Sequence, residues 1–179
     1  MRAPYLQRVE QLQYVLAQPG QGVGPRLGED VLELLDALEV RRAHFLGLSL
    51  GGIVGQWLAL HAPQRIERLV LANTSAWLGP AAQWDERTAA MLMATNRHGL
   101  AGSFAAVRDT DLRAQLARIE RPTLVIAGAF DRCTAGSVTS LAPAIDAAIS
   151  SPGLAAVHLS NVEFPPAFEG AGLSFLRAD

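Results

Sequence analysis

The sequence predicts an α/β fold, a mostly parallel sheet with flanking helices, and three observations carry that prediction. Short apolar runs of strand length alternate along the chain with longer segments of helical spacing. Two of these runs, within residues 65–75 and 121–131, are almost wholly apolar, as is typical of strands buried on both faces of a parallel sheet. The 179 residues, 50% of them hydrophobic and 18% charged, are enough for a single domain, residues 1–179.

The first predicted helix covers residues 26–40, where apolar side chains recur at helical spacing. Glu29 and Asp30 are expected in its first turn, where the helix dipole favours negative charge. The next elements are, in order, a strand over residues 42–48, a helix over 51–63 that Pro63 ends, and a buried strand over 65–75.

The second half of the chain continues the alternation of helices and strands. Residues 77–116 form a mixed, mostly helical region. The later elements are a buried strand over residues 121–131, a helix of small side chains over 134–149, a weak fourth strand over 154–160, and a closing helix over 164–176 with prolines near its start.

Composition excludes several classes of partner and chemistry. The net charge is −2 with both signs interspersed, so we expect neither a nucleic acid nor a membrane as partner. The chain has no lysine, which excludes Schiff-base and P-loop lysine chemistry. Its single cysteine, Cys133, cannot form an internal disulfide and is interpreted as a packing residue. Together with the absence of a signal-peptide pattern at the N-terminus, this favours a cytoplasmic location.

One motif carries chemistry. Residues 47–51 read Gly-Leu-Ser-Leu-Gly and lie between a predicted strand and a predicted helix, where a G-x-S-x-G elbow belongs. Such a turn strains the backbone at the central residue and needs very small neighbours, a need that Gly47, Gly51 and Gly52 are expected to meet. It would present the Ser49 hydroxyl above the end of the strand and aim the Leu50 N–H at an oxyanion.

A serine nucleophile needs a base and an orienting acid, which follow in the chain order Ser, acid, His in elbow hydrolases. Asp131 ends a buried strand, and Gly128 is expected to let the chain turn there. His158 lies on the loop after the last predicted strand. The other histidines fit this order less well; they are His44, His61 and His98.

Three segments resemble the 3-oxoadipate enol-lactonases of bacterial aromatic degradation, which belong to the α/β-hydrolase superfamily. They are residues 47–76, 111–131 and 157–176, and the runs "ANTSA" and "HLSNVE" are the most family-specific parts. The resemblance implies Ser49 as nucleophile, Asp131 as acid and His158 as base, with the Leu50 N–H as half of the oxyanion hole. It implies no metal or organic cofactor. Trp84 falls at the entrance of the family's cap, where it could line the pocket or serve only in packing.

The chain departs from the family in ways that predict an incomplete α/β-hydrolase fold. We expect the family's N-terminal strands to be missing, including the one that precedes the loop supplying the second oxyanion donor, because only residues 14–24 resemble a worn version of one family strand and its turn. Residues 77–116 resemble a remnant of the helical cap, and within them only the final part of the cap is recognisable. We therefore expect an oxyanion hole that lacks its second donor, and a substrate pocket that is more open to water.

The missing strand would leave an exposed apolar edge along residues 42–48. Three outcomes stay open: residues 12–17 pair with this edge, a second subunit covers it in a homo-oligomer, or the protein aggregates.

Three functions are compatible with these residues. The first is hydrolysis of a small-molecule lactone or carboxylic ester, with the enol-lactone favoured by the resemblance. The second is another reaction on the same residues, as in an esterase, a thioesterase or a cofactor-free perhydrolase. The third is a catalytically impaired remnant or interaction module. A substrate carboxylate could be anchored by an arginine, and the candidates are Arg87, Arg97 and Arg108, although each is equally compatible with the solvated surface.

Overall fold

A four-stranded parallel sheet organises the part of the chain that the computed structural model describes, namely residues 23–77, 79, 110–132, 134 and 137–178. The strands lie in the order β1-β2-β3-β4. They are β1 (Ala43–Leu48), β2 (Ile66–Ala72), β3 (Thr123–Ile126) and β4 (Ala148–Ser150). The longer helices are α2 (Val23–Ala37), α3 (Leu50–His61) and α8 (Pro165–Leu176). The parallel α/β architecture predicted from the sequence is therefore confirmed.

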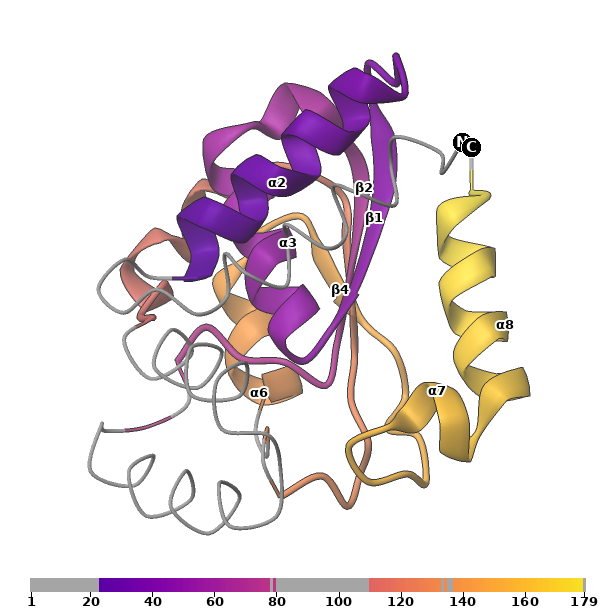
Figure 1. The fold of residues 1–179 in the computed structure, drawn as a ribbon. Helices are drawn as coiled ribbons and strands as arrows, with labels where there is room; N and C mark the ends of the chain where they lie inside the picture. Colours follow the sequence, from indigo (N-terminus) through magenta and orange to yellow (C-terminus); the bar gives the residue numbers. More distant parts are fainter. Residues whose placement is uncertain (1–22, 78, 80–109, 133, 135–136, 179) are drawn as a thin grey trace, which may run out of the picture.

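The helices cover both faces of the sheet, with α2 and α3 on one side and α8 on the other (Figure 1). Successive residues of β2 alternate between the two faces, as strand geometry requires. Leu69 and Leu71 pack with α3 in the larger buried cluster, and Val70 and Ala72 join the smaller cluster beneath α8. This two-sided burial explains why β2 has no alternating polar pattern in its sequence.

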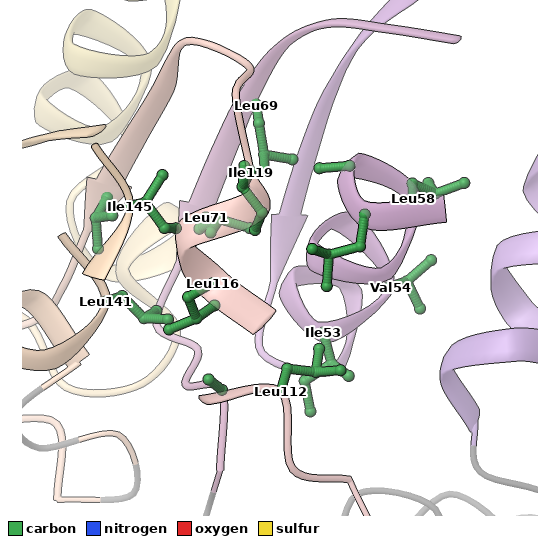
Figure 2. Close-up of a cluster of buried hydrophobic side chains, with 14 of the residues drawn as sticks. Ile53, Val54, Leu58, Leu69, Leu71, Leu112, Leu116, Ile119, Leu141 and Ile145 are labelled. Carbon is green, nitrogen blue, oxygen red and sulfur yellow. The ribbon is translucent and has the colours of Figure 1, made fainter. Parts of the chain in front are cut away.

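The larger cluster joins α3 to the sheet and to the short helix η2 (Arg113–Arg118). Figure 2 shows Ile53, Val54 and Leu58 of α3 on one side of this cluster and Leu141 and Ile145 on the other. Leu116 and Ile119 lie between them. Helix α3 is therefore packed into a close-packed interior, and it cannot shift without disturbing that packing.

Helix α2 begins three residues earlier than predicted, at Val23, so Glu29 and Asp30 lie beyond its first turn. Only some of the apolar side chains in the segment predicted as helix face the core. Leu27, Val31 and Leu32 pack against the larger cluster, whereas Leu34 and Leu38 are exposed.

Two predictions in the second half were wrong in their bounds. The helix expected over 134–149 is present only as α6 (Ser137–Leu141) and a 3-10 turn, η3 (Ala142–Ala144), because Pro143 has no N–H to continue the α-helical hydrogen bonds. The fourth strand is Ala148–Ser150, not residues 154–160. Leu154 makes only an isolated bridge to Gly128, and the residues after it form a loop and the short helix α7 (Ser160–Glu163).

Strand β1 lies at one end of the described strand order and pairs with β2. Leu46 on β1 is 43% exposed and has α8 nearby, at Gly172. Several segments on which predictions were made lie outside the described residues. They are residues 12–17, expected at this edge, most of the expected cap (78 and 80–109), and Cys133, expected in packing. The homo-oligomer stays a prediction. No helix among the described residues is long and apolar enough to cross a membrane.

Asp30 on α2 is a destabilising carboxylate and yields a first prediction. Burial raises its pKa above the ordinary value, and the neighbouring charges of Glu33 and Glu29 raise it further, against a smaller effect of Arg26. Its Oδ2 is buried without a hydrogen-bond partner in the described part of the chain. A carboxyl group whose pKa is raised by folding destabilises the fold above that pKa, and the penalty disappears at a pH below its unfolded pKa. We expect Asp30→Asn to raise Tm at pH 7 and to have less effect near pH 3.

Asp36 on the same helix is the matched control. Its Oδ1 lies 2.8 Å from Nη2 of Arg65, so Asp36→Asn removes an ion pair and should leave Tm unchanged or lower it slightly. Thermal unfolding of both variants at pH 7 and pH 3 checks the prediction. An equal or lower Tm for Asp30→Asn at pH 7 would contradict it.

Candidate active site

Ser49 occupies a strained bend between β1 and α3. Its backbone has φ 55° and ψ −116°, a conformation that residues with a side chain rarely adopt. Two hydrogen bonds to β2 and its C-terminal end hold the bend in place. The Ser49 N–H donates to the carbonyl of Ala72 at 2.9 Å, and the hydroxyl of Thr74 donates to the Ser49 carbonyl at 2.7 Å. The strand–turn–helix context predicted for the G-x-S-x-G motif is present.

Ser49 stands at the N-cap of α3 but does not cap the helix with its side chain. A serine there ordinarily accepts a hydrogen bond from a backbone N–H of the first turn with its side-chain oxygen. Here Oγ lies 2.9 Å from Nε2 of His158 instead. The position therefore gives up local helix stabilisation for a contact with a residue 109 positions later in the chain.

The glycines of the motif are not equivalent. A Cβ on Gly47 would lie 2.1 Å from the carbonyl oxygen of Gly51, and one on Gly52 would lie 2.4 Å from the Thr74 side chain. By contrast, nothing lies within 4 Å of a Cβ built on Gly51. The expectation that Gly51 must be small for steric reasons was therefore wrong, because its hydrogen already faces open space at the start of α3.

Asp131 lies on the loop after β3 and is almost completely buried. The Thr134 N–H donates to Oδ1 at 3.3 Å, and the Thr134 hydroxyl and the Asn73 amide both donate to Oδ2, the latter at 2.9 Å. These donors replace the water that a buried carboxylate loses, and they favour its ionised form. Gly128 makes the loop possible by close approach, since its Cβ would lie 2.1 Å from the Val157 carbonyl oxygen.

His158 connects the serine to the aspartate. Its Nδ1 lies 2.9 Å from Asp131 Oδ2, and its Nε2 lies 2.9 Å from Ser49 Oγ. An ionised carboxylate can only accept, so Nδ1 carries the proton and Nε2 is left to accept from the serine hydroxyl. The His158 side chain is 29% exposed, whereas that of Asp131 is 1% exposed. The structure thus brings together all three residues that the sequence suggested.

The remaining predicted site residues have mixed outcomes. Leu50 is the first residue of α3, so its N–H belongs to the turn whose amides have no acceptor within the helix. Trp84 and the three arginine candidates lie outside the described residues, as does His98. His44 faces Glu67 at 3.8 Å, and the Nδ1–H of His61 donates to the Trp57 carbonyl at the end of α3.

Sequence reasoning assigned no role to several side chains that hold the site together. Asn73, Thr74, Thr134 and Glu163 hydrogen bond to the segments that carry Ser49, Asp131 or His158, and Ser160, two residues after His158, donates to Asn73. The signal was present, since Asn73 and Thr74 belong to "ANTSA" and Ser160 and Glu163 to "HLSNVE". The sequence alone does not show which atoms of these two runs come into contact.

Known proteins resemble this chain in sequence. A family described as "alpha/beta hydrolase fold" matches residues 25–95. "3-oxoadipate enol-lactonase 2" of Acinetobacter baylyi is 35% identical, over 83% of this chain and 70% of that protein. A protein of Rhizobium rhizogenes, named provisionally as carbamate hydrolase RutD, is 28% identical over 89% of this chain and 76% of its own length.

Solved structures resemble it in fold. A hydrolase from Pseudomonas aeruginosa PA01 superposes with a TM-score of 0.79 at 66% identity, covering 90% of this chain and 74% of that one. The enol-lactonase from Burkholderia xenovorans LB400 superposes with a TM-score of 0.81 at 31% identity, covering 90% of this chain and 76% of that one. The predicted α/β-hydrolase fold is therefore confirmed.

The contrast between the two outer glycines of the motif yields the second prediction. Gly47→Ala forces a methyl group against the backbone of the elbow and should cost about 3 kcal/mol, a fall in Tm of roughly 6–12 °C. Gly51→Ala fills open space in a helix and should be neutral or stabilising by up to about 1 kcal/mol. Thermal unfolding of the two variants checks the difference. Equal destabilisation by both would show that the close approach at Gly47 does not hold the bend.

Proposed function

The chain belongs to the 3-oxoadipate enol-lactonase family of the α/β-hydrolase superfamily, and from that premise we propose that it hydrolyses a carboxylic ester or lactone through Ser49, His158 and Asp131. The observation that carries the proposal is the hydrogen-bond chain from Ser49 Oγ through the imidazole to Asp131 Oδ2, with both contacts at 2.9 Å. Distances of this kind allow a serine to lose its proton as it attacks.

The first step is attack on the substrate carbonyl. Ser49 Oγ forms a bond to the carbonyl carbon while its proton passes to Nε2 of His158. The imidazole becomes positively charged, and Asp131 stabilises that charge and holds the ring in the orientation that faces the serine. Because Asp131 is buried and held by several donors, its position changes little as the charge develops.

The negative charge on the carbonyl oxygen needs a donor close to Ser49. We assign this role to the Leu50 N–H, which starts α3 and therefore lies at the positive end of the helix dipole. A donor of this kind is worth about 10²–10³ in rate.

Collapse of the intermediate breaks the bond to the leaving oxygen, which takes the proton from His158 Nε2. Water then attacks the acyl group on Ser49, with His158 as base, and releases the acid. An enol-lactone suits this scheme because its leaving group is an enol that becomes a ketone, so the ring opens more readily than an alkyl ester is cleaved.

We propose 3-oxoadipate enol-lactone as the substrate and the breakdown of aromatic compounds as the setting. The names of the Acinetobacter relative and of the Burkholderia structure support this choice. Carbamates are the second candidate class, because the Rhizobium relative carries that name and hydrolysis of a carbamate could begin at the same serine.

The third prediction tests the nucleophile and the substrate together. We expect the wild type to open the enol-lactone faster than it cleaves p-nitrophenyl acetate or a phenyl carbamate, and Ser49→Ala to lower kcat by about 10⁴-fold or more. A fluorophosphonate should label the wild type and Ser174→Ala, an exposed serine on α8, but not Ser49→Ala.

The outcomes separate the alternatives. Faster turnover of the carbamate would replace the lactone as substrate while keeping the mechanism. No turnover and no labelling of the wild type would reject the hydrolase and leave the impaired remnant.

A further inference from the structure

Asn73 contacts two segments of the candidate site at once. It follows β2 directly, its side chain is buried, and its backbone has φ 44°. Its Nδ2 donates to Asp131 Oδ2 at 2.9 Å and to the Val157 carbonyl at 3.1 Å, and its Oδ1 accepts from the Ser160 hydroxyl. One amide therefore binds the acid and both ends of the short segment that carries His158.

Asparagine suits this position for two independent reasons. The three contacts need two N–H donors and one acceptor in a planar group, which the asparagine amide supplies and neither aspartate nor leucine does. The left-handed backbone at this position also favours asparagine over most residues with a side chain.

We propose that Asn73 is a positioning residue of the hydrolase, one that fixes the separation between Asp131 and His158 and thereby the reach of the imidazole to Ser49. The proposal rests on the proposed function. Thr134 binds Asp131 through its own loop and so cannot set this separation, whereas Asn73 reaches across from a different strand end to both partners.

The segment carrying His158 is also held from its solvent side. Glu163 of α7 accepts from the Val157 N–H at 2.8 Å and from the Leu159 N–H at 3.2 Å. Glu163 is exposed, so water can replace much of what it provides, and we expect Asn73 to contribute more. Two carboxylates of the described residues thus bind the His158 segment: Asp131, from the loop after β3, at the imidazole, and Glu163, from α7, at the backbone on either side of it.

The test compares Asn73→Ala and Asn73→Asp with the wild type, using p-nitrophenyl acetate and the enol-lactone. A misplacement of the imidazole by a fraction of an ångström to about 1 Å should lower kcat about 10²-fold and change KM by less than about threefold. Glu163→Ala should lower kcat by roughly tenfold or less. Asn73→Asp should lower kcat at least as much as Asn73→Ala, because a second carboxyl group in contact with the buried Asp131 cannot donate two hydrogen bonds and adds like-charge repulsion.

Val70→Ala is the matched control for stability, since Val70 is a buried residue of the same strand that packs beneath α8. It should lower Tm and leave kcat unchanged below the unfolding transition. Equal kcat for the wild type and both Asn73 variants, or a loss no larger than in Val70→Ala, would overturn the proposal. Should Asn73→Ala and Asn73→Asp fail to fold, Ser160→Ala removes only the Oδ1 contact and should lower kcat about three- to tenfold.

A readout without turnover separates this inference from the proposed function. The proton on His158 Nδ1, held by Asp131, should give a downfield resonance in the wild type and in Val70→Ala, and a weaker or exchange-broadened one in the Asn73 variants. If the wild type turns over neither substrate but the resonance depends on Asn73, the positioning role stands and the hydrolase fails. If turnover depends on Ser49 while the resonance and kcat ignore Asn73, the hydrolase stands and the positioning role fails.

Discussion

The left-handed bend at Ser49 is the constraint on which the rest of the site depends. Backbone in such a conformation costs of order 1–3 kcal/mol, so it persists only where its surroundings determine it fully. Here those surroundings are the Ala72 carbonyl, the Thr74 hydroxyl and a helix whose next turns are packed into the main core. Relaxation of the bend would pull α3 out of that core, and so the packing of Ile53 and Leu58 helps to hold the Ser49 hydroxyl in place.

The buried polar groups near Ser49 form a network in which each member satisfies the others. Asp131 would be costly to bury alone, yet it accepts from His158, Asn73 and Thr134. Asn73 in turn donates from its amide nitrogen to Asp131 and to the Val157 carbonyl, and its amide oxygen accepts from Ser160. A network of this kind is rigid because moving any member leaves a buried donor or acceptor unpaired. Rigidity of the acid and the base is what a positioned proton transfer needs.

The sequence predicted the parts of this arrangement that depend on local pattern and failed where geometry across strands decides. Ser49, Asp131 and His158 could be found because the chain order and the strand ends restrict them. The fourth strand was misplaced because Ala148–Ser150 is short and weakly apolar, whereas residues 154–160 look more like a strand and instead lie beyond the end of the sheet. The role of Asn73 was missed because it depends on contacts 58 and 84 positions away. The error at Gly51 had the same origin, since only the backbone shows which hydrogen faces open space.

The strand register explains why these distant residues meet at all. Leu48 pairs with Ala72, and Ala72 pairs with Ile126, so β1, β2 and β3 end at the same level. The first residues past the ends of β1 and β2 are Ser49 and Asn73, both with positive φ, and both turn their side chains into the space above the sheet edge. The loop after β3 is drawn to the same space because Gly128 lets it approach the His158 segment closely. The contacts that define the candidate site therefore arise from three strands that end at the same level, with two bends and one close approach just beyond their ends. A shift of the β2 register by one residue would exchange Asn73 for Ala72 at the sheet edge and turn the following side chains to the opposite face. The same register that buries Val70 and Leu71 on opposite faces thus also sets the alignment of Ser49, Asp131 and His158.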